Sequence, residues 1–550
     1  MNGAQALIRT LVQAGVTTCF SNPGTSEMHF VAALDSVPQM RAVLALFEGV
    51  ATGAADGYAR MADAPGATLL HLGPGLGNGL ANLHNARKAR VPVVNIVGDH
   101  ATYHTQYDAQ LQSDIETVAR NVSSWVRTSA RTEDLPNDTV QAIAAAAGPP
   151  GQVATLILPA DVSWGEGAEP AVPAPPVPAP PPSGETVEAV AGALRSGKSS
   201  ALLLGGRALR HDALMAAGQI AAASGARLLA EVFPTRLERG AGRPPVERLA
   251  YLPELASVQL RGIKHLILVD AKSPVTFFAY PGKRSDLVPE GCQVHELAGP
   301  AADVAGGLDA LVEALGAGAA RPVLAPAGRP SPAAGSLTAE TVCQTIAAVL
   351  PEGAIVSDET QTSGVTLMAQ TAGAPPHDWL TLTGGAIGQG LPAAVGAAIA
   401  APDRPVLALE ADGSALYTIQ ALWTMAREEL NVTVVIFNNR SYAILNLELA
   451  RVGAEATGDR AAAQLDLGRP DVDFVTIGNG FGVPSRRVDT TEQLTEALGT
   501  ALREPGPHLI EVVIPSTFSP RRLRAMPYAL RGLEKLPRPL AAAVKQRFYP

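Results

Sequence analysis

Residues 406–439 read VLALEADGSALYTIQALWTMAREELNVTVVIFNN. Two apolar runs, VLALEA and VTVVIF, flank a stretch that is long enough for a helix. Consecutive apolar residues, rather than alternating ones, are typical of strands covered on both faces, as in parallel sheets between helices. The stretch therefore predicts a strand–helix–strand unit whose two strands end at the same edge of the sheet.

Polar residues follow each of these predicted strands. Asp412, Gly413 and Ser414 follow the first, and Asn439 ends the second, 27 positions after Asp412. One carboxylate and one amide oxygen would converge at the shared edge, and such hard oxygen ligands suit Mg²⁺, which fills its shell with phosphate and water. Backbone N–H groups at Gly413 and Ser414 would favour a diphosphate there. Taken singly, Asp-Gly-Ser is more often a helix cap and Asn-Asn a turn.

The same alternation of apolar runs and helical patterns recurs along all 550 residues, which are too many for one core. Two stretches made mostly of Pro, Ala and Gly cannot pack a core and are expected to be linkers. We therefore predict an α/β protein with three doubly wound parallel-sheet domains. The predicted order is domain 1–165, linker 166–185, domain 186–315, linker 316–336, domain 337–520 and tail 521–550.

Bulk composition excludes several classes of protein. The net charge is −9 and the sequence pI about 5.7, so there is no basic field for nucleic acid or an acidic membrane. Cys19, Cys292 and Cys343 lie too far apart for a disulfide framework or zinc site. No run reaches about 18 apolar residues, and the N-terminus resembles an amphipathic helix rather than a signal peptide. We expect a soluble, cytoplasmic enzyme.

The Asp-Gly-Ser and Asn-Asn pair, at this spacing, resembles the thiamine diphosphate motif of the acetolactate synthase and benzoylformate decarboxylase superfamily. The resemblance implies pyrimidine-binding, central and diphosphate-binding domains, in that order. It also implies that Asp412, the Asn439 side chain and the Ser441 carbonyl hold Mg²⁺ against the diphosphate. One departure is Ala411, where the family usually has glycine and where a methyl group would crowd the phosphate turn.

Residues 43–60, VLALFEGVATGAADGYAR, place Glu48 where an apolar strand meets a helix. An acid in a first helical turn is commonly there to offset the helix dipole. The family's glutamate lies in the same context. By resemblance, Glu48 bonds N1′ of the cofactor aminopyrimidine and favours the tautomer that removes the proton from thiazolium C2.

Two glycine-rich segments extend the resemblance. The turn 22–25, Asn-Pro-Gly-Thr, resembles the decarboxylase Asn-Pro-Gly-Ser turn and puts Thr25 at the active-site hydroxyl position. The run GPGLGN from Gly73 resembles the family's Gly-Pro-Gly-x-x-Asn segment, with Asn78 in place, and does not complete a dinucleotide fingerprint. His71, just before it, is either structural or the catalytic histidine that benzoylformate decarboxylases carry here.

The remaining cofactor contacts are assigned by resemblance alone. The Gly385 carbonyl would bind the 4′-amino group of the aminopyrimidine, and Ile387 would donate its N–H to N3′ and wedge beneath the bent cofactor. The plain alternative is close helix packing by small residues. The residues expected near the diphosphate or closing the same pocket are Gln361, Thr362, Gly413, Ser414 and Tyr442, the last of which is equally typical of a core.

The middle of the chain departs from both close relatives. Residues 266–283, LILVDAKSPVTFFAYPGK, lack the Arg-Phe-Asp-Asp stretch with which acetolactate synthases bind FAD, so FAD is not expected. Phe277, Phe278 and Tyr280 stand where benzoylformate decarboxylases carry a second histidine. Asp99 and His100 replace the Gly-Gln of acetolactate synthases.

The resemblance implies a thiamine diphosphate- and Mg²⁺-dependent enzyme that decarboxylates a 2-oxo acid and passes the enamine to a second carbonyl compound, as an acetolactate synthase-like carboligase. A simple decarboxylase and a non-catalytic paralogue stay open, whereas a nicotinamide oxidoreductase lacks its fingerprint. The family's sites lie between subunits, so a homodimer or homotetramer is expected. The substrate, the acceptor and the role of the tail, as a lid or a surface arm, are not fixed by the sequence.

Overall fold

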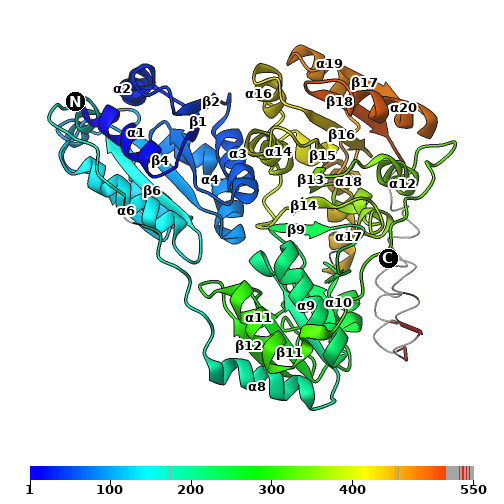
Figure 1. Cartoon of the computed structure of the whole chain (residues 1–550). Coiled ribbons are helices and arrows are strands. Elements are labelled where there is room, and N and C mark those ends of the chain that lie inside the picture. The colour runs from blue at the N-terminus through cyan, green and yellow to red at the C-terminus, as the bar shows by residue number, and fades with distance from the viewer. Residues whose placement is uncertain are drawn as a thin grey trace.

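The computed structural model describes residues 1–515 apart from 174, 453 and 455–457, together with 532, 536, 537, 540, 541 and 544. Three sheets, each flanked by helices, form three lobes (Figure 1). The predicted class, three doubly wound parallel-sheet domains, is confirmed. Most of the predicted tail 521–550, and with it the choice between a lid and an arm, lies outside the described residues.

The first sheet is parallel throughout, in the order β2-β1-β3-β4-β6-β5. Its strands are β1 (Thr18–Asn22), β2 (Arg41–Leu44), β3 (Gly66–Leu70), β4 (Val93–Asp99), β5 (Trp125–Thr128) and β6 (Val153–Pro159). Its helices are α1 (Gly3–Gln13), the expected amphipathic first helix, α2 (Met28–Ala33), α3 (Glu48–Ala62), α4 (Leu72–Ala89), α5 (Ile115–Arg120), α6 (Leu135–Ala147) and α7 (Ala160–Trp164).

The central sheet is also parallel, in the order β10-β8-β7-β11-β12. Its strands are β7 (Ser200–Leu204), β8 (Arg227–Ala230), β10 (Glu247–Arg248), β11 (His265–Val269) and β12 (Gln293–Ala298). Its helices are α8 (Gly184–Arg195), α9 (His211–Ser224), α10 (Pro253–Leu260) and α11 (Val304–Ala314). Strand β9 (Arg236–Arg239), although it comes from the stretch 186–315, instead pairs antiparallel with β14 of the third sheet.

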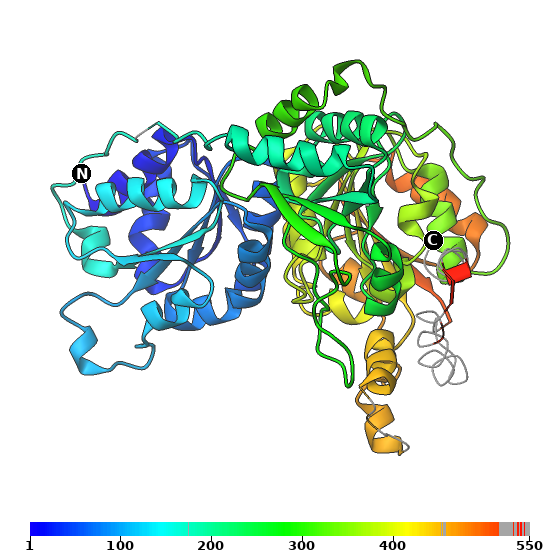
Figure 2. The same ribbon diagram turned by 90° about the horizontal axis from the view of Figure 1, so that it is seen from below.

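The third sheet has the order β17-β18-β16-β15-β13-β14-β9. Its other strands are β13 (Ile355–Glu359), β14 (His377–Thr381), β15 (Val406–Ala411), β16 (Val432–Asn438), β17 (Ser485–Val488) and β18 (His508–Val513). Its helices are α12 (Ala339–Val349), α13 (Leu367–Gln370), α14 (Gly390–Ala400), α15 (Asp412–Ala415), α16 (Ala421–Arg427), α17 (Ala443–Arg451), α18 (Asp459–Ala463), α19 (Phe474–Gly480) and α20 (Thr491–Ala501). Figure 2 shows α17 and α18 projecting from this domain.

Apart from β9, the third sheet repeats the strand order of the first, with β13 to β18 in the places of β1 to β6. Helices α3 and α14 therefore follow equivalent strands, β2 and β14, and they face each other where the two domains meet (Figure 1). Glycines allow the close approach, because a Cβ on Gly57 would lie 2.1 Å from the Ala393 carbonyl oxygen and one on Gly396 1.9 Å from that of Ala54.

The cores explain why the strands read as unbroken apolar runs. Every residue of β7, β11, β14 and β16 is buried, since helices cover both faces of each sheet. Within the described residues, no helix is both long and apolar enough to cross a bilayer.

Candidate active site

The ends of β15 and β16 meet as the sequence predicts. Asp412 opens α15, and its Oδ1 accepts a hydrogen bond from the Gly413 amide at 2.9 Å. Its Oδ2 accepts one from the Arg440 amide at 2.6 Å, just past β16. Asn439 Oδ1 accepts from the Ser441 amide at 3.0 Å. The fold therefore brings together the three residues that the resemblance assigns to Mg²⁺.

The chemistry of this corner fits a divalent cation. Asp412 is buried, and burial raises its pKa to about 6 although backbone amides oppose the shift. The basic side chain beside it is committed elsewhere, because Arg440 forms an ion pair with Asp471 at 2.7 Å. A buried carboxylate that accepts hydrogen bonds from backbone amides, next to an amide oxygen, is a donor set that Mg²⁺ accepts and completes with phosphate and water.

Ala411 does not strain the turn in which the family usually has glycine. Its backbone has φ −81° and ψ 149°, which any L-residue adopts. The close approach falls on the next glycine instead, since a Cβ on Gly413 would lie 2.5 Å from Cε1 of Tyr442. Tyr442 thus packs directly on the turn, as expected for a residue that closes this pocket. The Ser414 hydroxyl donates a hydrogen bond to the Ala411 carbonyl at 3.1 Å.

The predicted diphosphate segment lies beside this corner. Gln361 begins the 3₁₀ turn η6 (Gln361–Gly364) with φ 52°, a left-handed conformation that is uncommon outside glycine. Thr362 is buried next to it. Ser363 Oγ accepts a hydrogen bond from the side chain of Asn439 at 3.3 Å. Gln361 and Thr362 therefore stand next to the Asn439 side of the candidate Mg²⁺ site.

A bend at residues 384–390 is held from two sides and open on the third. Asn85 of α4 donates to the Ala386 carbonyl at 2.8 Å, and the buried Glu359 accepts from the amides of Gly388 and Gly390 at 2.8 and 2.6 Å. Gly385 and Gly388 have φ of 75° and 93°, which suits glycine. Within the described residues, the Gly385 carbonyl and the Ile387 amide have no hydrogen-bond partner. These are the groups assigned above to the aminopyrimidine.

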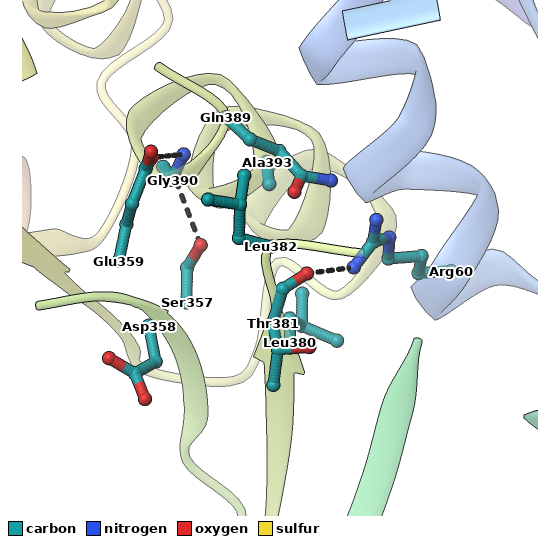
Figure 3. A pocket seen from close by; sticks show the side chains of 10 residues that line it. All are labelled: Arg60, Ser357, Asp358, Glu359, Leu380, Thr381, Leu382, Gln389, Gly390 and Ala393. Carbon is teal, nitrogen blue, oxygen red and sulfur yellow. Dashed lines mark hydrogen bonds between the residues drawn. The ribbon is translucent and has the colours of Figure 1, made fainter. Parts of the chain in front are cut away.

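Helix α3 is tied to this bend through a buried arginine (Figure 3). Arg60 forms an ion pair with Asp56 at 2.8 Å and donates to the Thr381 carbonyl at 2.8 Å. Gln389 hydrogen-bonds to the same Asp56. Both charges are fully enclosed, so a substitution that removes one would leave the other unpaired inside the protein, which is costly. The junction fixes the bend relative to the first domain.

The first-domain residues also converge. Glu48 is the first residue of α3, and its Oε2 accepts a hydrogen bond from Asn78 of α4 at 3.0 Å. Gly75 lies between Glu48 and His71, since a Cβ there would lie 3.1 Å from Glu48 Oε1 and 3.5 Å from His71 Cβ. Asn82 links this cluster to the bend within one chain, because its amide reaches the carbonyls of Gly49 and Gly388 at 2.8 and 3.1 Å.

A residue that the sequence reasoning missed holds His71. Glu27 is fully buried, and its Oε2 lies 2.8 Å from His71 Nδ1 and accepts from the Gly24 amide at 2.6 Å. Burial raises the pKa of Glu27 in spite of these bonds. The His71 ring packs on Gly24, beside the exposed Thr25, so both predicted catalytic groups share one rim. In the sequence, Glu27 is an acid three residues after a glycine turn, and this pattern is typical of a helix cap.

Two features of the central domain bear on the site. The Gly205-Gly206 turn faces carboxylates, because Asp270 accepts from the Arg207 amide at 2.8 Å and Glu231 from that of Gly206 at 3.3 Å. These acids occupy the place that a phosphate would need in a nucleotide site. Phe277 lies against the open bend, with its Cζ 2.6 Å from where a Cβ on Gly385 would be.

Comparison with known proteins agrees with this geometry. Residues 1–119 match the model of the thiamine pyrophosphate enzyme N-terminal TPP binding domain, and residues 362–512 match that of the C-terminal TPP binding domain. Both clusters of candidate residues fall within these matches, apart from Gln361, which lies one residue before the second. The fold and site thus define a thiamine diphosphate enzyme.

The chain belongs to the acetolactate synthase and 2-oxo acid decarboxylase family of these enzymes. It is 61% identical, over 94% of its length and 99% of the relative's, to a Mycobacterium tuberculosis protein provisionally named acetolactate synthase large subunit IlvX. It is 31% identical to benzoylformate decarboxylase of Pseudomonas aeruginosa, over 90% of this chain and 96% of that protein. Among solved structures, 4-hydroxybenzoylformate decarboxylase of Rhodococcus jostii superposes with TM-score 0.83 and 27% identity, covering 94% and 100% of the two chains.

Proposed function

We propose that the protein is a Mg²⁺-dependent thiamine diphosphate enzyme that decarboxylates a small 2-oxo acid and transfers the remaining acyl fragment to a second carbonyl compound, as an acetolactate synthase-like carboligase. The observation that carries the proposal is the bend at 384–390. It is fixed on two sides and, within the part of the chain that the structure describes, leaves the Gly385 carbonyl and the Ile387 amide without hydrogen-bond partners, as a preformed ligand site requires.

The chain's residues would divide the work as follows. Asp412, Asn439 and the Ser441 carbonyl would hold Mg²⁺, and Gln361, Thr362 and the Gly413-Ser414 turn would bind the diphosphate. When bound, thiamine diphosphate would supply a nucleophilic carbanion and an electron sink for the electron pair that remains when CO₂ leaves. Glu48 would hold the proton at the pyrimidine N1′, while Ile387 would support the ring.

Phe277 supports carboligation over aldehyde release. Release as an aldehyde needs a proton at the reacting carbon, and a general acid must lie within hydrogen-bond reach to give it. His71, braced by Glu27, is one such group on the first-domain rim. On the opposite rim, where the benzoylformate decarboxylases carry a second histidine, Phe277 offers only an apolar edge. A carbonyl acceptor can then compete with protonation.

The test is product analysis by NMR. The purified chain, with thiamine diphosphate and Mg²⁺, is incubated with pyruvate or benzoylformate. A 2-hydroxy ketone or acetolactate supports the proposal, and an aldehyde alone replaces it with the simple decarboxylase. The Glu48→Gln variant should lose cofactor C2 proton exchange but still bind cofactor. Exchange at the wild-type rate in this variant would refute the role of Glu48.

A change at Phe277 separates the two activities. Phe277→His returns a titratable group to the rim beside Gly385, so the aldehyde fraction of the product should rise severalfold, because one general acid contributes on the order of 10²-fold or more. Phe278→His is the matched control, since its ring packs on Phe277 at 4.9 Å and is half exposed. Equal product ratios in both variants would show that this rim does not govern the outcome.

The decarboxylase is the second candidate, and the contact between Glu27 and His71 favours it. A buried carboxylate that orients a histidine beside the predicted Thr25 hydroxyl is an arrangement suited to proton delivery. If this route dominates, His71→Ala should slow aldehyde formation while leaving any ketone product unaffected.

A further inference from the structure

A cavity lies between the central and third domains, away from the candidate active site. It has a volume of about 200 Å³ and is bordered by the end of β9, the loop that follows it and α13. Much of its wall is apolar, with Leu237, Val246, Val365 and Met368 among the lining residues. It is therefore large enough for a small organic molecule but not for a nucleotide.

Arg239 lines this cavity and has no acidic partner among the described residues. Its guanidinium is partly buried and donates to the Thr371 hydroxyl and to the Met368 carbonyl, both neutral acceptors. It also contacts Nε2 of His377, whose pKa burial lowers to about 4, so that ring is neutral near pH 7. Burial, and repulsion from Arg248, lower the pKa of Arg239 to about 9, which leaves it a cation at neutral pH.

Among the described residues, no acidic side chain pairs with this cation. Arg243 and Arg248 line the same wall, and Arg248 has a partner of its own. Glu247 lines it too, but forms an ion pair with Arg227 at 2.6 Å. The Arg243 side chain forms no ion pair or hydrogen bond with another described residue. A cation taken out of water without a counter-charge is unfavourable, so the positive charge of Arg239 and Arg243 would be stabilised by an anion from outside the chain.

We propose that the cavity binds a small amphiphilic anion. Its carboxylate or phosphate head would sit between Arg239 and Arg243, because a guanidinium matches both oxyanions in geometry and charge. Its apolar body would pack against Val246, Val365 and Met368. The site is separate from the cluster at Glu48 and Asp412, and the inference does not depend on which reaction the enzyme performs.

Titration calorimetry on the full chain, saturated with thiamine diphosphate and Mg²⁺, tests the proposal. The probes are butyrate, ethyl phosphate, inorganic phosphate and the uncharged butyramide. Butyrate or ethyl phosphate should bind, inorganic phosphate more weakly because it lacks the apolar body, and butyramide not at all. The stronger of butyrate and ethyl phosphate identifies the head group. Equal binding of butyrate and butyramide, or no binding of either anion, overturns the proposal.

Variants locate the binding. Arg243→Ala removes a side chain that pairs with no other described residue, and it should weaken binding of the anion about tenfold, as expected for a lost hydrogen bond to a charged group. Arg243→Lys, which keeps the charge, should recover part of that affinity. Arg120→Ala, on an exposed turn of α5, is the control and should change nothing. An unchanged affinity in Arg243→Ala would show that the anion binds elsewhere, and it would contradict the proposed site in this cavity.

Discussion

At the scale of single residues, several buried acids in and near the site hold other groups of the chain in place. Glu27 braces His71, and Glu359 fixes the bend at 384–390. Glu410 is fully buried beneath Asp412, and burial together with the neighbouring Glu359 raises its pKa well above the usual range. Each such group adds rigidity to the site at a cost in desolvation.

Glu27 is predicted to position His71. Glu27→Gln keeps the shape but removes the charge that favours one orientation and protonation state of the imidazole. We expect kcat to fall about 10-fold or more with KM little changed, and the pH profile of kcat to shift. Glu185→Gln, on the exposed start of α8, is the control. If Glu27→Gln and His71→Ala have additive effects, the two residues do not work as a unit.

Glu231 should make stability depend on pH. Burial raises its pKa to about 7 from the usual 4.5, so the folded chain holds a proton that the unfolded chain has lost between these values. The free energy of unfolding therefore decreases as pH rises through this window, by at most about 3 kcal/mol from this group. Glu231→Gln should remove that decrease. Urea midpoints of both proteins at about pH 5 and pH 8 measure it, and parallel changes would contradict the assignment.

At the scale of elements, the first and third domains meet along α3 and α14. These helices follow equivalent strands of two sheets with the same order, and glycines at the contact let their backbones touch. The candidate residues sit at the ends of the neighbouring strands. The contact between the two helices therefore fixes how the first domain, which carries the Glu48 cluster, is held against the third domain, which carries the bend at 384–390.

Gly396→Ala tests this contact. The added methyl would lie 1.9 Å from the Ala54 carbonyl oxygen, so backbone must move, and such overpacking costs about 1–3 kcal/mol. The variant should lose stability and also bind thiamine diphosphate more weakly. Gly192→Ala is the matched control, since its Cβ meets nothing within 4 Å in α8 and should stabilise by about 0.5–1 kcal/mol. Equal denaturation midpoints for the two variants would show that the helix contact is not tight.

At the scale of the whole molecule, we propose a homodimer or homotetramer in which Glu48 of one subunit serves the Asp412 site of another. The two residues belong to different domains, and the resemblance assigns the active sites to subunit interfaces.

Mixing two inactive variants tests this arrangement. Glu48→Gln and Asp412→Asn each disable one half of a site. Unfolded together and refolded at equal amounts, they should regain about a quarter of wild-type activity, because random pairing restores one intact site in each mixed dimer. Each variant refolded alone is the control. No recovery in mixtures shown to contain mixed dimers would place both halves of a site in one chain.

The sequence alone predicted the strand ends and the polar residues that follow them. Runs such as VLALEA and VTVVIF fix strands locally, and a right-handed crossover places successive strand ends on one edge, so Asp412 and Asn439 had to meet. The cofactor class followed from motifs that lie within short segments.

Only the tertiary structure decided which groups that lie far apart in the sequence contact each other. Glu27 reaches His71 across 44 residues, and β9 leaves the central stretch for the third sheet. Among the described residues, Arg239 is met by neutral acceptors and by no acid. Burial and the absence of a counter-charge are properties of the assembled core. Because they depend on contacts between remote segments, no local pattern in the chain encodes them.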